Sequence, residues 1–130
     1  MNVDELNRFL TTQFEGFEPV PVVESATPHE TVARLPFHGR WIRPGNTLSG
    51  PAMMTLSDAV AYMALLTQTD QAAGALTSNL QIHFLKRPAP TDLIGKGRVI
   101  KCGRRLAVVG VDLFSNDELV AHATVTFAIP

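Results

Sequence analysis

The sequence predicts an α+β protein in which a curled antiparallel sheet of about six strands wraps one long central helix. Two observations lead to this fold class. An apolar segment in the middle of the chain has helical spacing, and the segments after it alternate apolar and polar residues at a period of two. Short turns separate these later segments, and short turns between long strands indicate antiparallel hairpins.

The first 45 residues predict one helix and two strands. Residues 2–14 carry apolar side chains at helical spacing, which predicts a short amphipathic helix. Residues 17–25 are rich in valine but interrupted by proline, which is typical of an edge strand. Residues 30–35 alternate loosely and predict a second strand, whereas the prolines and glycines of residues 36–45 indicate a loop.

Residues 49–67 predict the central helix. Ser49 can cap its first turn, and Pro51 suits that turn because the first N–H groups of a helix have no acceptor within it. The residues expected to face the sheet recur three and four positions apart, and they are Met53, Leu56, Val60, Met63, Ala64 and Thr67.

Four strands are expected after the helix. Residues 79–84 alternate strictly between apolar and polar side chains. Three further segments are long and rich in β-branched residues, and turn residues separate them. These segments are residues 93–101, 106–114 and 120–129.

The composition bounds the classes of protein to consider. The length predicts a single domain over residues 1–130. Hydrophobic residues make up 45% and charged residues 18%, which predicts a packed core and a surface partly covered by other subunits. A net charge of −1 argues against a nucleic-acid partner. The four histidines and one cysteine show no metal-ligand spacing, so no metal is expected.

The sequence predicts a cytoplasmic protein. Cys102 is the single cysteine, so no internal disulfide is possible and a reducing compartment is expected. The N-terminal residues lack the basic and apolar regions of a signal peptide. The longest apolar run is interrupted by Gly50, Pro51 and Asp58, so we expect no membrane-spanning segment.

Asp58 is the most informative residue, because it is the only charged side chain between Arg43 and Asp70. Burying an ionised carboxylate is costly unless the group is paired or hydrogen-bonded. A carboxylate within so apolar a segment is therefore a candidate acid, base or nucleophile. The alternative is an aspartate on the solvated edge of the helix.

Five short segments, in their order and spacing, resemble the PaaI-like acyl-CoA thioesterases, which have the hotdog fold. They are residues 46–51, 56–58, 84–93, 103–107 and 120–124. The family signature is His-Gly-Gly at the helix start, with an acidic residue eight positions after the first glycine. Gly50 and Asp58 match this spacing, whereas Ser49 replaces the histidine and Pro51 the second glycine.

The resemblance implies the roles of the site residues. The Gly50 N–H would form an oxyanion hole at the positive end of the helix dipole, and Asp58 would act as general base or nucleophile. The alternative for Gly50 is a helix-start glycine needed only for packing. Thr77, or else Ser78, would supply a hydroxyl beside the site.

An asparagine of the family is absent from its usual place. It often precedes the oxyanion glycine by seven positions, where this sequence has Arg43. In relatives it helps to position the attacking water or the thioester. The resemblance implies that this role has passed to Asn46 or Ser49.

The spacing of Gly50 and Asp58 predicts a site shared by two subunits. Two helical turns, a rise of about 12 Å, separate them, so one carbonyl carbon cannot contact both within a chain. The resemblance implies a homodimer whose central helices run antiparallel, with Gly50 from one chain and Asp58 from the other. A dimer of dimers is the expected larger assembly.

The expected substrate is an acyl-CoA, whose phosphates call for basic side chains near the pocket mouth. Lys86, Arg87, Arg104 and Arg105 are the candidates. The CoA belongs to the substrate, so no separate cofactor is expected. Two other functions stay open: a non-catalytic acyl-CoA-binding protein, suggested by the replaced histidine and asparagine, and a hotdog dehydratase or hydratase, which would need a histidine near the carboxylate.

Overall fold

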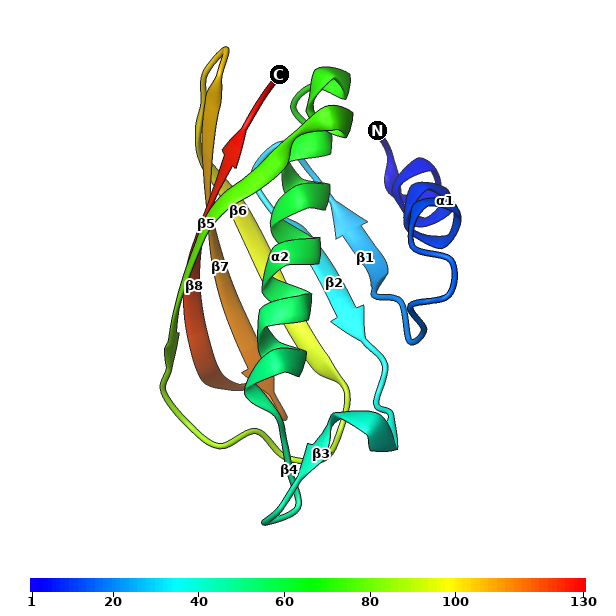
Figure 1. Cartoon of the computed structure of the whole chain (residues 1–130), viewed down its shortest axis with the longest axis vertical. Coiled ribbons are helices and arrows are strands. Elements are labelled where there is room, and N and C mark those ends of the chain that lie inside the picture. The colour runs from blue at the N-terminus through cyan, green and yellow to red at the C-terminus, as the bar shows by residue number, and fades with distance from the viewer.

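The computed structural model describes residues 1–130, and its main feature is an antiparallel sheet curled around the helix α2, Gly50–Leu66 (Figure 1). The strand order is β1-β2-β6-β7-β8-β5. This confirms the predicted fold class and the predicted sequence of helix, two strands, long helix and four strands. The six strands are β1 (Val22–Ala26), β2 (Thr31–Leu35), β5 (Leu76–Phe84), β6 (Leu93–Cys102), β7 (Leu106–Ser115) and β8 (Glu118–Ala128).

Smaller elements complete the fold. The helix α1 lies beside β1, and a two-stranded hairpin of β3 and β4 precedes α2 (Figure 1). None of the helices combines the length and the apolar character needed to cross a membrane. The smaller elements are α1 (Val3–Gln13), β3 (Ile42–Arg43), β4 (Thr47–Leu48) and two short 3₁₀ helices over Gly39–Trp41 and Asp70–Gly74.

Local sequence explains where α2 begins and ends. The Ser49 side chain accepts a hydrogen bond of 3.3 Å from the Ala52 N–H, and Pro51 lies in the first turn. At the other end, the Thr67 hydroxyl donates to the Ala64 carbonyl at 2.6 Å. The helix predicted over residues 49–67 is therefore confirmed together with its N-cap.

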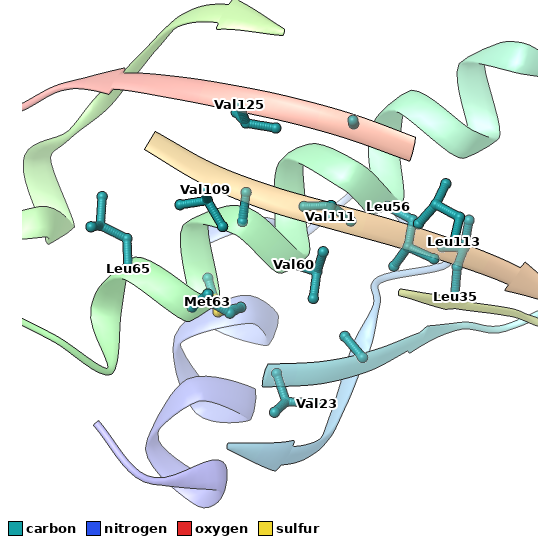
Figure 2. Packing of buried hydrophobic residues seen from close by; sticks show 14 of the residues in the cluster. Val23, Leu35, Leu56, Val60, Met63, Leu65, Val109, Val111, Leu113 and Val125 are labelled. Carbon is teal, nitrogen blue, oxygen red and sulfur yellow. The ribbon is translucent and has the colours of Figure 1, made fainter. Parts of the chain in front are cut away.

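The concave face of the sheet buries one side of α2, and Figure 2 shows side chains of both layers meeting there. Leu56, Val60 and Met63 of α2 are 0% exposed, as is Val109 of β7. Burying one side chain of this size contributes about 1.5–3 kcal/mol. Gly97 in β6 allows the close approach of the two layers, because a Cβ there would lie 3.3 Å from the Val60 carbonyl oxygen.

The segment before β2 differs from its prediction. A strand was expected over residues 17–25, but β1 begins only at Val22. Pro19 and Pro21 explain the delay, because proline lacks the N–H that a sheet ladder requires. The side chain of Asn7 in α1 then donates to the Val23 carbonyl at 3.0 Å and accepts from the Val23 N–H at 2.8 Å. These bonds cover the outer edge of β1.

The loop expected over residues 36–45 is also more structured than predicted. It contains the 3₁₀ helix and β3, whose residue Arg43 pairs with Thr47 of β4. Gly45 and Asn46 form the turn between them with positive φ angles of 97° and 55°. Asparagine tolerates this left-handed conformation, so the geometry of the turn accounts for an asparagine at position 46.

The opposite edge of the sheet is the free strand β5, which pairs only with β8. Its end residues Leu76 and Phe84 are 72% and 51% exposed. A long, exposed, partly apolar edge strand is a template for pairing with another chain. The fold therefore presents one edge that is covered by α1 and one that is open.

Candidate active site

Asp58 lies half-buried on α2, and the edge strand β5 supplies its hydrogen-bond partner. The Thr77 hydroxyl donates to the Oδ1 atom of Asp58 at 2.7 Å. A β-bulge between Thr77 and Asn79 interrupts the register of β5, and bulges re-aim side chains next to functional sites. The neighbouring Ser78 hydroxyl instead donates to the Thr126 carbonyl at 3.3 Å. Of the two hydroxyls expected, Thr77 is therefore the one beside Asp58.

The other side of Asp58 faces an apolar cavity of about 180 Å³ between α1, the segment that follows it, and α2. We call this the Asp58 cavity. Burying a carboxylate among apolar side chains is costly unless it keeps a hydrogen-bond partner, and Thr77 is that partner. The cavity is lined by Leu10, Phe14, Phe17, Pro19, Val20, Pro21, Thr55, Asp58, Ala59 and Tyr62.

Gly50 lies at a separate groove, at the N-terminus of α2. As the first residue of the helix, it has an N–H with no acceptor inside the helix, at the positive end of the dipole. A Cβ at this position would lie 3.5 Å from the Phe84 ring, so Gly50 leaves open space beside that ring. The groove, of about 530 Å³, is lined by Arg43, Pro44, Thr47, Leu48, Gly50, Met53, Phe84, Leu85, Lys86, Arg87 and Pro88. We call it the Gly50 groove.

A single chain does not bring the two predicted groups together. Gly50 lines the groove and not the cavity, whereas Asp58 lines the cavity and not the groove. The two residues are two turns apart on one helix, about 12 Å along its axis. One protomer thus holds a candidate oxyanion donor and a candidate base at different places.

Comparison with known proteins decides the family. A sequence model described as the thioesterase superfamily matches residues 45–126, which include the groove and the central helix. The chain belongs to the thioesterase superfamily. No curated protein matches the chain. Membership supports thioester hydrolysis as the general activity, as the resemblance predicted.

Solved structures of thioesterase-superfamily proteins resemble this one over nearly the whole chain. A candidate thioesterase from Silicibacter sp. TM1040 is 33% identical, with a TM-score of 0.87 over 100% of this chain and 92% of its own. Zebrafish thioesterase superfamily member 2 is 23% identical, with a TM-score of 0.87 over 100% and 99%. A phenylacetic acid degradation-related protein from Ralstonia eutropha JMP134 is 21% identical, with a TM-score of 0.79 over 93% and 99%. The predicted hotdog fold is thereby confirmed.

The basic residues of this thioesterase-superfamily chain divide into two groups. Lys86 and Arg87 line the Gly50 groove, as the sequence suggested, and Arg43 joins them there. Lys86 also forms an ion pair with Glu118. Arg104 and Arg105 lie instead on the β6–β7 turn, at the end of the molecule far from the start of α2 (Figure 1). One chain therefore brings only the first group to Gly50.

Two further residues named from the sequence have local structural roles. Asn46 is exposed in the β3–β4 turn and does not line the Gly50 groove. The Ser49 hydroxyl accepts the capping bond from the Ala52 N–H, which leaves its own proton free to donate.

Histidines do not approach the site. His83 and His122 are paired across β5 and β8 on the outer face of the sheet, away from α2. The Nδ1 atom of His122 lies 2.7 Å from the Oδ1 atom of Asp112. No group of three or more histidine, cysteine, aspartate or glutamate side chains is arranged to hold a metal ion.

Tyr62 is a further neighbour of Asp58 in the structure. It lies one helical turn after Asp58 and lines the same cavity. Its hydroxyl donates to the Ala73 carbonyl, and its ring contacts Phe9 edge-to-face at a centroid distance of 5.6 Å. Burial raises the pKa of the Tyr62 phenol. Its spacing of four from Asp58 places both residues on one helix face.

Proposed function

We propose that the protein is an acyl-CoA thioesterase, with Asp58 as its general base or nucleophile. One observation carries the proposal: the Asp58 carboxylate is held by the Thr77 hydroxyl at the wall of an apolar cavity. A carboxylate fixed in that way is suited to take a proton or to attack a carbonyl. Membership of the thioesterase superfamily supports the choice of a thioester as substrate.

In the general-base route, the Asp58 carboxylate takes a proton from a water molecule while the water oxygen attacks the thioester carbonyl carbon. The negative charge that develops on the carbonyl oxygen is stabilised by the Gly50 N–H. The C–S bond then breaks, and the CoA thiolate leaves and takes the proton from Asp58. In the nucleophile route, the Asp58 carboxylate attacks the carbonyl carbon, the C–S bond breaks and the CoA thiolate leaves. Water then hydrolyses the mixed anhydride, which frees the acid and restores the Asp58 carboxylate, and the proton that water releases goes to the thiolate.

The proposed enzyme is a homodimer built through β5, in which the partner's Gly50 serves the Asp58 of the first chain. The free edge of β5 supports this assembly, because its unpaired N–H and C=O groups can continue the sheet into a second copy. A dimer of dimers is the proposed larger assembly. The exposed free thiol of Cys102 is compatible with the reducing cytoplasm, where we place the enzyme.

In this proposal the Gly50 groove binds the CoA part of the substrate. Lys86 and Arg87 would bind its phosphates, because charge-assisted bonds from such groups to phosphate are strong. Arg104 and Arg105 would reach the same CoA only from another subunit. Asn46 and Ser49 are proposed to help position the thioester or the attacking water, and Ser49 keeps a proton to donate.

The test is release of CoA thiol from a panel of acyl-CoAs by the parent and by Asp58→Asn. Losing a general base costs about 10²–10⁴-fold in rate, so the variant should be nearly inactive. Asp112→Asn is the matched control, because it removes a carboxylate from the outer face of the sheet. If Asp58→Asn hydrolyses acyl-CoAs as fast as the parent, the proposed role of Asp58 is wrong.

A non-catalytic acyl-CoA-binding protein is the second candidate. The engagement of the Ser49 side chain in the helix cap, where the family signature has histidine, favours it. It predicts saturable binding of acyl-CoA without release of thiol from any member of the panel.

A further inference from the structure

We infer that the Asp58 cavity receives the acyl group of the substrate and admits groups no larger than about one aromatic ring, or six carbon atoms. This inference rests on the proposed thioesterase function and deepens it, because it names the class of acyl group. Three features of the cavity carry it: the chemistry of its lining, its volume, and the way its walls are held.

The Gly50 groove and the Asp58 cavity differ in chemistry in the same way as the two parts of an acyl-CoA, the charged CoA and the apolar acyl group. Arg43, Lys86 and Arg87 place cationic groups at the Gly50 groove, which suits a phosphate-bearing arm. The lining of the Asp58 cavity contains no cationic side chain, and most of it is apolar. An apolar acyl arm gains free energy by leaving water for such a lining. In the proposed dimer, the acyl group would lie in the Asp58 cavity of one chain and the CoA in the Gly50 groove of the partner, with the reacting carbonyl beside Asp58.

The volume of the Asp58 cavity limits what can enter. It measures about 180 Å³. An apolar protein cavity of about 150 Å³ binds benzene, which has six carbon atoms. A phenyl ring or a six-carbon chain can therefore be buried here, whereas a chain of twelve carbons would leave about half of its length in water.

The inner wall of the cavity is held in place by two contacts of Tyr62. The Tyr62 hydroxyl is bonded to the Ala73 carbonyl, and its ring is stacked on Phe127 at a centroid distance of 6.0 Å. Tyr62 therefore cannot swing aside for a longer chain without losing both interactions. Ala59, next to Asp58, contributes the smallest side chain of the lining, so this position sets the room that remains.

The outer wall is built by aromatic residues that solvent still reaches. Phe14 and Phe17, on the segment after α1, are 36% and 71% exposed. An acyl group bound in the cavity would cover part of these rings. A bound acyl group would thus supply apolar contact that these exposed rings do not find within the chain.

The experiment compares kcat/KM for acetyl-, hexanoyl-, phenylacetyl- and dodecanoyl-CoA in the parent and in Ala59→Leu. The parent should prefer hexanoyl- and phenylacetyl-CoA over dodecanoyl-CoA. Ala59→Leu should lower kcat/KM for those two substrates about tenfold or more relative to its effect on acetyl-CoA, since filling an apolar pocket discriminates by size. Ala128→Leu, an exposed position at the end of β8, is the matched control.

Phe17→Ala provides a second variant that does not threaten folding, because the ring is largely exposed. It opens the outer wall and should raise kcat/KM for dodecanoyl-CoA relative to hexanoyl-CoA. The inference is overturned if the parent hydrolyses dodecanoyl-CoA as well as hexanoyl-CoA. It is also overturned if Ala59→Leu lowers the rates for all four substrates equally.

A binding measurement separates this inference from the proposed function. Phenylacetamide is a suitable probe, because it carries a ring and no charge for Asp58 to repel. It should raise the melting temperature of the parent but not of Ala59→Leu. If the parent releases no CoA from any substrate and phenylacetamide still binds in this pattern, thioester hydrolysis is refuted and the cavity assignment stands. If phenylacetamide stabilises both proteins equally, the cavity assignment is wrong.

Discussion

The Thr77 hydroxyl donates a hydrogen bond of 2.7 Å to the Asp58 carboxylate and thereby joins the free edge of the sheet to the central helix. The two residues are 19 positions apart in sequence. Thr77 also pairs with Phe127 of β8, so the backbone that carries the hydroxyl is anchored in the sheet. The orientation of the candidate base consequently depends on the strand through which we expect the dimer to form.

Thr77 should act as a positioning residue for Asp58. Thr77→Val keeps the shape of the side chain but removes the donor, and hydrogen bonds to charged groups contribute about 1.5–3 kcal/mol. We expect kcat to fall about tenfold or more, with little change in KM. Thr77→Ser keeps the hydroxyl and should restore most of the rate. Equal losses in both variants would mean that the packing of the residue matters, and not its hydroxyl.

Much of the fold could be predicted from the sequence because its signals are local. Ser49 and Pro51 mark the start of α2, and strict alternation marks residues 79–84 as a strand. The beginning of β1 was placed too early, because the valines near Pro19 and Pro21 resemble a strand in composition. The backbone of those prolines cannot join the ladder.

The site was less predictable, because it is assembled by contacts between distant segments. The spacing from Gly50 to Asp58 could be read directly from the sequence. Thr77 and not Ser78 reaches Asp58 because of a β-bulge, which changes the face of the sheet toward which a side chain points. The alternation of apolar and polar residues in the sequence does not reveal this bulge. The approach of Phe14 and Phe17 to Asp58 depends on the packing of α1, which sequence spacing does not specify.

Arg87 should bind the CoA part of the substrate. We expect Arg87→Ala to raise KM for acyl-CoA about tenfold, because a charge-assisted contact to phosphate would be lost. The effect should shrink at high salt, which screens exposed charges. A thioester of N-acetylcysteamine, which has no phosphate, should be hydrolysed equally well by the variant and the parent. Arg98→Ala, on the exposed outer face of β6, is the matched control. Equal losses with both thioesters would contradict the assignment.

Tyr62 should make stability sensitive to alkaline pH. Burial raises the phenol pKa above its ordinary value of 10.0, so the folded state holds this proton more tightly than the unfolded chain. The contribution is complete below pH 10.0 and is lost as pH rises from there through the folded-state pKa. Tyr62→Phe should remove this part of the pH dependence and, at neutral pH, cost about 1 kcal/mol through the lost bond to Ala73.

The measurement for Tyr62 is simplified by the composition. Tyr62 is the single tyrosine, so the phenolate absorbance of the folded protein reports its pKa alone. Trp41 is the single tryptophan, and its fluorescence can follow urea unfolding in both proteins across the alkaline range. Identical loss of stability in the parent and in Tyr62→Phe above pH 10.0 would show that other groups cause it.

Hybrid dimers should reveal whether two chains share each site. Gly50→Ala adds a methyl group in ordinary contact with the Phe84 ring, at 3.5 Å, so the fold should persist while the approach of the thioester carbonyl is hindered. Gly50→Ala and Asp58→Asn should each be poorly active alone. When the two variants are unfolded together and refolded as a mixture, about half of the dimers should be hybrids. Each hybrid has one intact site of its two, so the mixture should regain about a quarter of the parental rate. A double Gly50→Ala, Asp58→Asn chain mixed with Asp58→Asn is the control and should regain nothing. If hybrids form but no activity returns, Gly50 and Asp58 of the same chain serve one site.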